Sequence, residues 1–482
     1  MTVAKLGLSP TGTLTKEYPG GMVPEGSPQG AGIADTGFAI GTGLKDCRVA
    51  VIGAGSGGLC AARYLSKAGV KELVVYEAGS KIGGLWCVNN DSGMSSAYQT
   101  LHINSPRDHT SFSDLPFDRN VQMFPDHRDM YLYFEKYARE FDLKKYIRFN
   151  SPVISVRKAA PFSKSAPMWE VVTANGGVER YDRVIVATGH LHNPMHLHQF
   201  KAFGGEYLHS HYYKHPGPYV GKRICIVGVG NSALDIASDV CVNSEKTVIV
   251  ARSGVMIHPK MIFGIPFPDI VRRLYKPWIP AWARTGIIHF LVRLIHGNME
   301  QYGFRPLKSR THGTSNAVFV HHLAYNRITV KHEIEKIEGK RLFFSDGTSD
   351  EFDVLVGATG YKFDLPFMDP ALLAPKDNAL ELYLRMVPPE LPGLYFLGFL
   401  QIGSSLPLAF EHQMRWIIGV ETGLIRLPDA GKMRAAIAAK QKWIRDTFKH
   451  SLRHQIEEDH SIYFAELRVP GAKKVFGYDL RT

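Results

Sequence analysis

Residues 47–58, CRVAVIGAGSGG, place a run of strand-forming residues directly before a glycine-rich turn. A helix-prone stretch continues to Lys67, and a second strand-like run, ELVVYE, covers residues 72–77. Strand, turn, helix and strand in this order predict one βαβ unit of a parallel sheet.

The turn has the GxGxxG spacing that binds the pyrophosphate of a dinucleotide, because a tight turn, close approach of the backbone and close helix packing each require a glycine. Glu77 ends the second strand, where a carboxylate accepts hydrogen bonds from ribose hydroxyls. An ordinary turn in an α/β core is the alternative. The expected nucleotide site comprises Gly53, Ala54, Gly55, Ser56, Gly57, Gly58 and Glu77.

A second unit of the same kind begins with RICIVGVGNSALDIASDV at 223–240 and continues with TVIVARSG at 247–254. Its second strand ends in Arg252 and Ser253 rather than in an acid. A guanidinium binds a 2′-phosphate that a carboxylate repels, so this unit is predicted to prefer NADPH, with NADH as a weaker donor. A solvated charge at a strand end is the alternative. The GxGxxA turn of this unit comprises Gly228, Gly230, Ser232 and Ala233.

Two further strand-like runs, RVIVATGH at 183–190 and VLVGATGY at 354–361, both end in Ala-Thr-Gly. Their positions suggest the exit to and the return from an inserted domain. The predicted fold is therefore α/β, with two Rossmann-like dinucleotide-binding domains, the second inserted into the first. The expected segments are a Gly/Pro-rich arm at 1–46, the first domain at 47–197, the inserted domain at 198–330 with a helical insertion at 261–310, and the rest of the first domain with C-terminal helices at 331–482. The arm is either mobile or a strap lying on the folded body.

Two dinucleotide sites of different kinds in one chain indicate electron transfer. NADPH gives a hydride, and a flavin is the natural acceptor, because FAD carries the ADP group that the first turn binds. The five cysteines form no CxxC pair, which argues against a disulfide reductase. The final acceptor is then oxygen, an electron-carrier protein or an organic molecule.

The insertion contains one predicted helix at 282–296, on which Thr285, His289, Arg293 and His296 form a polar stripe. The apolar side chains that cover the rest are Ile287, Ile288, Phe290, Leu291, Leu294 and Ile295. This helix either packs on the body or caps a channel. Alternatively, segment 270–296 contacts a membrane surface or a partner, since basic residues flank it.

Composition sets further limits. The chain has 482 residues, 45% of them hydrophobic and 21% charged, which is typical of a globular protein. The net charge of +12 permits an anionic partner, but no motif indicates nucleic acid. No leader or membrane-spanning run is apparent and the cysteines are widely spaced, so a cytoplasmic protein is expected. Asn193-Pro194 interrupts the histidines between His190 and His198, so a linker is favoured over a metal site and no metal is predicted.

One stretch lies between the two turns and belongs to neither. Phe203, Gly205, His209 and Tyr213 match FxGxxxHxxxY, and the chain resembles the flavin-containing monooxygenases in this signature. GAGSGG, GGLW, LHINSPRDHTSFSDLPF, GVGNSA and GLYFLGFLQIGSSLPLAFEHQMRW occur in that family's order. The resemblance covers residues 47–465. Tyr213-Lys214 stands where the related Baeyer–Villiger enzymes usually have Trp and then Pro or Asp.

The resemblance implies a mechanism and further site residues. O2 would add to reduced flavin as a C4a-hydroperoxyflavin, which would oxygenate a nucleophilic nitrogen or sulfur of a small substrate. Asn104 would be the active-site amide, Gly205 would give the signature backbone freedom, and His209 would bond across the joint between domains. Leu85, Trp86, Ser105 and Gln401 would line the FAD, and Ser232 and Ala233 the NADP.

Several alternatives stay open. Baeyer–Villiger oxidation of a ketone uses the same chemistry, and an NADPH oxidase would release hydrogen peroxide. A flavoprotein acting as a nucleotide-sensing interaction module is a different class. A homodimer is expected, and the chain departs from membrane-bound members in lacking an apolar C-terminal tail.

Overall fold

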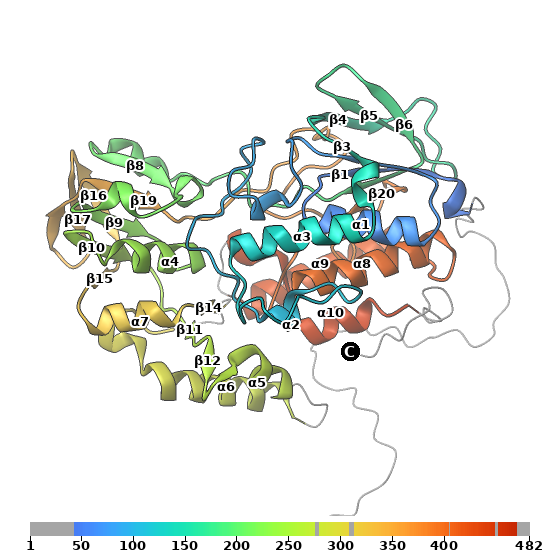
Figure 1. Ribbon diagram of the computed structural model, residues 1–482. Helices are drawn as coiled ribbons and strands as arrows, with labels where there is room; N and C mark the ends of the chain where they lie inside the picture. Colours follow the sequence, from blue (N-terminus) through green and yellow to red (C-terminus); the bar gives the residue numbers. More distant parts are fainter. Residues whose placement is uncertain (1–42, 275–278, 308–312, 404, 449–451, 470–482) are drawn as a thin grey trace, which may run out of the picture.

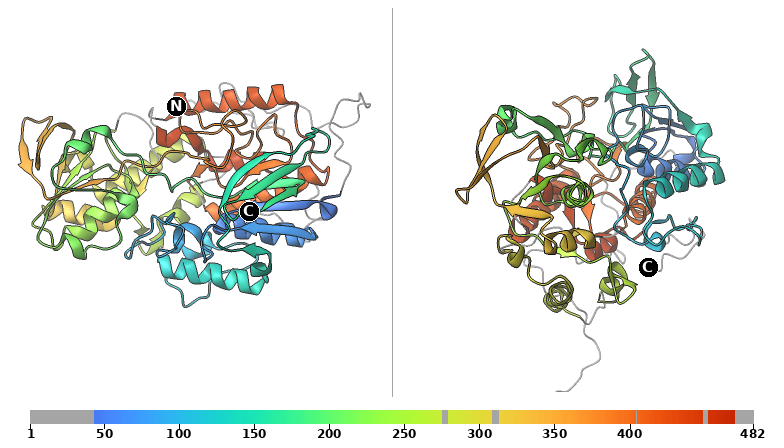
Figure 2. Two further views of the ribbon diagram at one scale, coloured as in Figure 1. Left: turned by 90° about the horizontal axis from the view of Figure 1, so that it is seen from above. Right: turned by 60° about the vertical axis from the view of Figure 1, so that its left-hand side comes forward.

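A computed structural model describes residues 43–274, 279–307, 313–403, 405–448 and 452–469. Residues 1–42 of the predicted arm and the last residues of the chain lie outside these ranges. The described chain forms two lobes, each built on a five-stranded parallel sheet (Figure 1). Seen from above, the second lobe lies at one end of the molecule and the first lobe with the C-terminal helices at the other (Figure 2).

The first sheet has the order β20-β7-β1-β2-β3, and each neighbouring pair is parallel. Its strands are β20 (Leu394–Phe396), β7 (Arg183–Val186), β1 (Arg48–Ile52), β2 (Glu72–Tyr76) and β3 (Ile147–Arg148). The helices of this lobe are α1 (Ser56–Lys67), α2 (Arg107–Thr110), α3 (His127–Glu140), α8 (Leu406–Glu421), α9 (Ala430–Thr447) and α10 (His460–Glu466).

Side chains of β1 alternate between two cores. Val49 and Val51 face a cluster formed with α1, α3 and α8, whereas Ala50 and Ile52 face a cluster formed with an antiparallel sheet, β4-β5-β6. Successive side chains of a strand point to opposite faces, so the wholly apolar run VAVI matches a strand that is covered on both sides. The covering sheet consists of β4 (Val153–Lys158), β5 (Trp169–Thr173) and β6 (Val178–Tyr181).

The second lobe repeats this sandwich. Its parallel sheet has the order β15-β10-β9-β19-β8, with α4 and α7 on one face and the antiparallel sheet β16-β17-β18 on the other. Its parallel strands are β15 (Ile328–Lys331), β10 (Lys246–Val250), β9 (Arg223–Val227), β19 (Val354–Gly357) and β8 (Glu206–His209). The covering elements are α4 (Asn231–Val240), α7 (Ala317–Ala324), β16 (Ile334–Glu338), β17 (Arg341–Phe344) and β18 (Ser349–Glu351).

The pairing of the strands shows that the chain re-enters the first lobe at a later residue than expected. β19 pairs with both β8 and β9, so the second lobe extends to Gly357 and the boundary expected at residue 331 is wrong. In each lobe an antiparallel three-stranded sheet directly precedes the parallel strand that runs into Ala-Thr-Gly, β7 in the first lobe and β19 in the second. The strand run at 354–361 therefore ends the second domain, just as the run at 183–190 ends the first part of the first domain.

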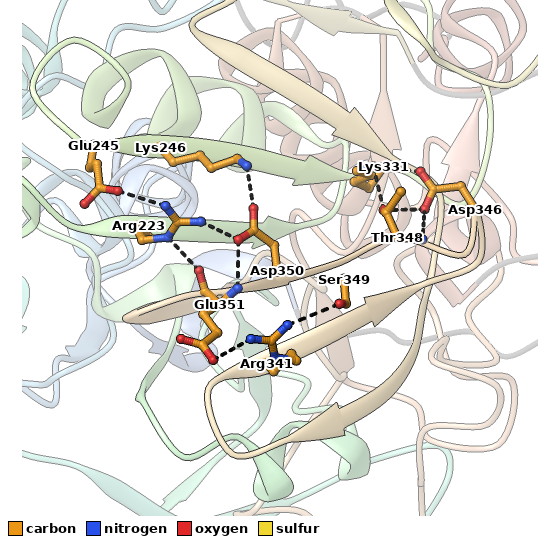
Figure 3. A network of polar contacts seen from close by, with 10 residues as sticks. All are labelled: Arg223, Glu245, Lys246, Lys331, Arg341, Asp346, Thr348, Ser349, Asp350 and Glu351. Carbon is orange, nitrogen blue, oxygen red and sulfur yellow. Dashed lines mark hydrogen bonds and ion pairs between the residues drawn. The ribbon is translucent and has the colours of Figure 1, made fainter.

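A polar network fixes the antiparallel sheet to the base of the second lobe (Figure 3). Arg223 and Lys246, the first residues of β9 and β10, both donate to the Asp350 carboxylate of β18. Burial acts to raise the pKa of Asp350, but the hydrogen bond from Lys246 and the nearby positive charges bring it below its usual range. The network lies at the amino ends of the parallel strands, away from the glycine turns.

Two chain segments connect the lobes side by side. The Met195 N–H donates to the carbonyl of Gly360 at 2.9 Å, and the Lys362 N–H donates to the carbonyl of Asn193 at 2.9 Å. Pro194 and Tyr361 form an antiparallel bridge between these bonds. The outgoing and returning chain thus pair as a short double strand between the two domains.

The insertion adds α5 (Phe267–Leu274) and α6 (Ala281–His296), which confirms the predicted helix. The polar stripe expected on α6 does not match the exposed side of the helix throughout. His296 is buried against the carbonyl of Ile257, whereas Trp282, Phe290 and Leu294 are 74%, 64% and 63% exposed. Among the described helices, none has both the length and the apolar character needed to cross a bilayer.

Short elements complete the fold. The small strands are β11 (Ile257–His258), β12 (Met261–Ile262), β13 (Ile265–Pro266), β14 (Thr314–Ser315), β21 (Gln401–Ile402) and β22 (Glu457–Glu458). The 3-10 turns are η1 (Leu44–Asp46), η2 (Gly84–Trp86), η3 (Leu143–Tyr146), η4 (His198–Ala202), η5 (Ser210–Tyr212), η6 (Gly217–Tyr219), η7 (Met299–Tyr302) and η8 (Leu452–Ile456).

Candidate active site

The first glycine turn joins β1 to α1 at the carboxyl edge of the first sheet. Gly53 has φ of 100°, and a Cβ atom on it would lie 2.8 Å from the carbonyl oxygen of Ala187. A Cβ on Gly58 would lie 1.8 Å from the carbonyl oxygen of Gly53. α1 has no side-chain cap, so the first N–H groups of the helix, from Ser56 onward, face the turn. This turn has the shape and the free donors that a pyrophosphate needs.

Glu77 lies directly after β2 and beside this turn. One of its carboxylate oxygens accepts from the Ala54 N–H at 2.8 Å, and the other accepts from the Gly79 N–H at 2.9 Å. Burial raises the pKa of Glu77, and the backbone hydrogen bonds oppose that rise. Each oxygen keeps a second lone pair, so the fixed carboxylate can also accept from ribose hydroxyls.

The second glycine turn repeats this geometry. Gly228 has φ of 134°, and a Cβ atom there would lie 2.3 Å from the carbonyl oxygen of Ala358. Gly230 precedes α4, which has no side-chain cap, and Ala233 is fully buried in the first turn of that helix. In both lobes the alanine of Ala-Thr-Gly therefore lies under the first glycine of the turn, which explains why both strands end alike.

Arg252 lies two residues past the end of β10, the strand that follows the second glycine turn and α4. Its side chain is exposed. The Arg305 guanidinium donates to the carbonyl of Arg252 at 3.2 Å and holds this backbone in place. Within the described ranges the Arg252 guanidinium forms no ion pair with a carboxylate. Ser253 follows it and is half-buried. The position agrees with a 2′-phosphate site.

Asn104 lies in a loop of the first lobe that the backbone fixes on both sides. The Ile103 N–H donates to the carbonyl of Pro125 at 2.9 Å, and the Arg107 N–H donates to the carbonyl of Met123 at 2.8 Å. The Asn104 side chain is half-buried. In the part of the chain that the structure describes, its amide has no hydrogen-bond partner. A held loop that presents an unpaired amide suits a group that acts on a bound cofactor or substrate.

The remaining predicted flavin contacts come from three segments. Leu85 and Trp86 lie in η2, and the Leu85 carbonyl accepts from the Ser95 hydroxyl at 2.6 Å. Ser105 shares a hydrogen bond of 2.8 Å with Thr110. Gln401 begins β21 and is half-buried.

The signature residues occupy a joint, but two of the expected roles differ. Gly205 has no left-handed φ. It is required because a Cβ atom there would lie 2.6 Å from the carbonyl oxygen of Asp353 and 2.7 Å from the Phe203 ring. His209 accepts locally from the His211 N–H at 3.1 Å, and its ring packs edge-on against Tyr361 of the returning segment.

Other residues make the bonds between the domains. The Lys214 ammonium donates to the carbonyls of Ser95 at 2.8 Å and Ala97 at 3.1 Å, and the Gln99 N–H donates to the Lys214 carbonyl at 2.8 Å. His211 Nε2 lies 3.2 Å from the carbonyl oxygen of Gly93. These contacts hold segment 93–101 of the first domain against the signature of the second.

Two carboxylates of α4 hold the same segment, and sequence reasoning missed both. Asp235 accepts from the Tyr98 hydroxyl at 2.5 Å, and Asp239 accepts from the Thr100 hydroxyl at 2.9 Å. The hydroxyl of Tyr213, the last signature residue, donates to Asp239 as well. The sequence did contain a signal for them, because Asp235 and Asp239 are spaced i and i+4 on the helix that follows the second glycine turn.

The fold and this site are typical of one class, the oxidoreductases with two dinucleotide-binding lobes, and here Glu77 lies beside the glycine turn of one lobe and Arg252 near that of the other. A family model for flavin-binding monooxygenase-like proteins matches residues 46–475. Dimethylaniline monooxygenase (N-oxide-forming) 2 of Rattus norvegicus is 34% identical over 454 residues, which cover 89% of this chain and 83% of the relative. Flavin-containing monooxygenase 5 of Homo sapiens is 33% identical over 441 residues, covering 87% and 82%.

A solved structure of S-allyl-L-cysteine S-oxygenase from Allium sativum has the same fold, with a TM-score of 0.65 and 24% identity over 90% of each chain. Cyclohexanone monooxygenase in an open crystal structure gives a TM-score of 0.60 and 17% identity, covering 90% of this chain and 99% of the other. The chain belongs to the flavin-containing monooxygenase family and is an enzyme. FAD and NADPH are the cofactors of this family, as the sequence predicted.

Proposed function

We propose that the chain oxygenates a nucleophilic nitrogen or sulfur atom of a small substrate, using NADPH, FAD and O2. The observation that carries this proposal is the pairing of two alike glycine turns with opposite side chains, Glu77 in one lobe and Arg252 in the other. A carboxylate suits the ribose of FAD, and a guanidinium suits the 2′-phosphate of NADPH.

The residues divide the work between binding and positioning. The turn around Gly53 and the first N–H groups of α1 would hold the pyrophosphate of FAD, and the turn around Gly228 would hold that of NADPH. These residues would hold the two cofactors, and the flavin, when bound, would supply the redox chemistry between NADPH and O2. The Asn104 amide would donate to the reacting oxygen without delivering a proton, because an amide does not ionise at neutral pH.

The overall reaction balances as substrate, NADPH, H⁺ and O2 giving oxygenated substrate, NADP⁺ and water. One oxygen atom enters the substrate, and the other leaves as water with two electrons from the nicotinamide. The name of the Rattus norvegicus relative includes N-oxide formation, which supports a nitrogen nucleophile.

The test is product analysis with the purified, flavin-loaded protein. NADPH consumption, O2 consumption and hydrogen peroxide are measured with N,N-dimethylaniline, a thioether and a cyclic ketone in turn. We expect about one N-oxide or sulfoxide for each NADPH. Lactone as the sole product would instead indicate a Baeyer–Villiger enzyme, and peroxide alone would indicate an oxidase. A protein that takes up no flavin would refute the proposal as a whole.

We further propose that the exposed side of α6 rests on an anionic membrane surface. Trp282, Phe290 and Leu294 are exposed there, and Arg272 and Arg273 are exposed on α5, which packs with α6 in one apolar cluster. Apolar side chains with neighbouring arginines are typical of interfacial helices. Sedimentation with phosphatidylserine-containing vesicles, against pure phosphatidylcholine, should show binding that the Trp282→Ser/Phe290→Ser double variant loses. A homodimer and a cytoplasmic location stay predictions, and light scattering after size exclusion tests the first.

A further inference from the structure

One side chain of the first domain belongs to the core of the second. Tyr98 is 4% exposed, and it packs in the apolar cluster built by α4, α7 and the second parallel sheet. Its ring meets the Tyr213 ring edge-on, with 5.8 Å between the ring centres. Leu101 packs against the same cluster. A segment that precedes the Asn104 loop is thus embedded in the NADP domain rather than in its own.

Two side-chain hydroxyls of this segment bond to a single helix. Asp235 and Asp239 lie one turn apart on α4. They accept hydrogen bonds from the hydroxyls of Tyr98 and Thr100, respectively. Asp235 also accepts from the Asn316 amide at 2.6 Å, which fixes the carboxylate from its other side. Burial raises the pKa of Asp235, while the hydrogen bonds from Tyr98 and Asn316 oppose that rise. Two charge-assisted hydrogen bonds to one helix make a firm connection.

The same helix begins at the nucleotide turn. α4 spans Asn231–Val240, so its first N–H groups face the turn at Gly230 and its last two turns hold segment 93–101. A helix of this length is about 15 Å long and moves as one body. At its far end the segment is tied to the first domain, where the His127 N–H donates to the Leu101 carbonyl at 3.0 Å. Asn104 follows three residues later.

From this arrangement we infer that Asp235 and Asp239 are positioning residues, through which α4 carries segment 93–101 and sets the place of Asn104 when NADP(H) binds. The inference rests on the proposed function, since it takes the turn at Gly230 as the nucleotide site. Protein side chains engage both carboxylates, so no part in the chemistry itself is assigned to them. Their effect reaches the Asn104 amide through Tyr98 and Thr100.

Two conservative substitutions remove the bonds from the segment to α4 and leave its contacts with Lys214 and His211 in place. Tyr98→Phe removes the hydroxyl but keeps the ring in the core, and Thr100→Val removes the other hydroxyl at an exposed position. Matched controls are Tyr181→Phe, whose hydroxyl bonds only within the first domain, and Thr247→Val, whose hydroxyl bonds Ser244 within the second.

The first measurement needs no turnover. Hydrogen–deuterium exchange of the FAD-loaded protein is followed with and without NADP⁺. We expect NADP⁺ to slow the exchange of amides in residues 97–103, although these residues do not form the nucleotide turn. The Tyr98→Phe/Thr100→Val double variant should lose this protection while keeping protection at the second glycine turn. Protection at 97–103 that persists in the double variant would overturn the inference.

The second measurement separates positioning from stability. Because a displacement of about 1 Å at a reacting group costs up to about 100-fold in rate, we expect the ratio of oxygenated product to hydrogen peroxide to fall at least about tenfold in the double variant. The control variants should keep the ratio of the unmodified protein. A ratio unchanged in the double variant refutes the inference alone, whereas an unmodified protein that forms no product from any substrate refutes the proposed function instead.

Discussion

Replacing Arg252 with alanine should convert the second lobe from a site that prefers NADPH to one that accepts NADH almost equally. The Arg252 side chain is exposed and forms no ion pair with a carboxylate in the described part of the chain, so its guanidinium is available to a phosphate. The Arg305 side chain bonds the carbonyl of Arg252 rather than its side chain, so the substitution leaves the backbone anchored.

The expected size of the effect follows from this exposure. A hydrogen bond to a charged group contributes about 1.5–3 kcal/mol, and solvent exposure places this one toward the lower limit. Since about 1.4 kcal/mol corresponds to a tenfold change in affinity, a loss near about 1.5 kcal/mol should raise the Kd for NADPH about tenfold. The Kd for NADH, which has no 2′-phosphate, should change less than about twofold, because no charged contact is lost.

The assay is anaerobic stopped-flow reduction of the bound flavin, with NADPH and NADH varied separately. Arg341→Ala is the matched control, because Arg341 is an exposed arginine of the same lobe that pairs with Glu351 far from the glycine turn. It should leave both Kd values unchanged. Equal weakening of NADPH and NADH by Arg252→Ala would show that Arg252 does not contact the 2′-phosphate.

Three further outcomes are expected. Asn104→Ala should retain flavin, because the loop is held by backbone bonds, yet should release hydrogen peroxide in place of product; unchanged coupling would exclude this amide from the reaction. Glu421→Gln removes the partner of the buried Arg183 and should cost about 3–5 kcal/mol of unfolding free energy, measured by denaturant titration. Because the pKa of Asp350 is lowered in the folded protein, its stabilising contribution is complete above about pH 4 and is lost as the pH falls further. Asp350→Asn should therefore lose less unfolding free energy on acidification than the unmodified protein does. Identical pH profiles of the unfolding free energy would contradict this.

Local pattern was sufficient to predict the two glycine turns. Gly53 and Gly228 have positive φ and lie against a carbonyl, which are properties of a few consecutive residues and therefore visible in sequence. The order of β1, α1 and β2 follows from the same local rules.

Contacts distant in sequence could not be predicted in this way. Tyr98 reads as a loop residue, and only the folded chain shows that it fills the core of the other domain. The boundary at residue 331 failed for a related reason: β16, β17 and β18 cover the second sheet as β4, β5 and β6 cover the first, and this equivalence appears only when both sheets are seen. His209 accepts a local bond from the His211 N–H and meets the returning segment through its ring, which spacing could not show because it does not give the direction of a side chain.

The paired segments between the lobes have a mechanical consequence. Met195 and Gly360, on the outgoing and returning chain, are hydrogen bonded to each other, so the inserted domain leaves and rejoins its host at one place. A body attached by two strands side by side can swing about the line through them but resists twisting around either one. Segment 93–101 adds a second attachment, because Tyr98 lies in the core of the second lobe, so that lobe is not free to swing about this line alone. The neighbouring ends would let a short linker rejoin the first lobe after removal of the second. An excised second lobe, however, would lose the Tyr98 ring from its core.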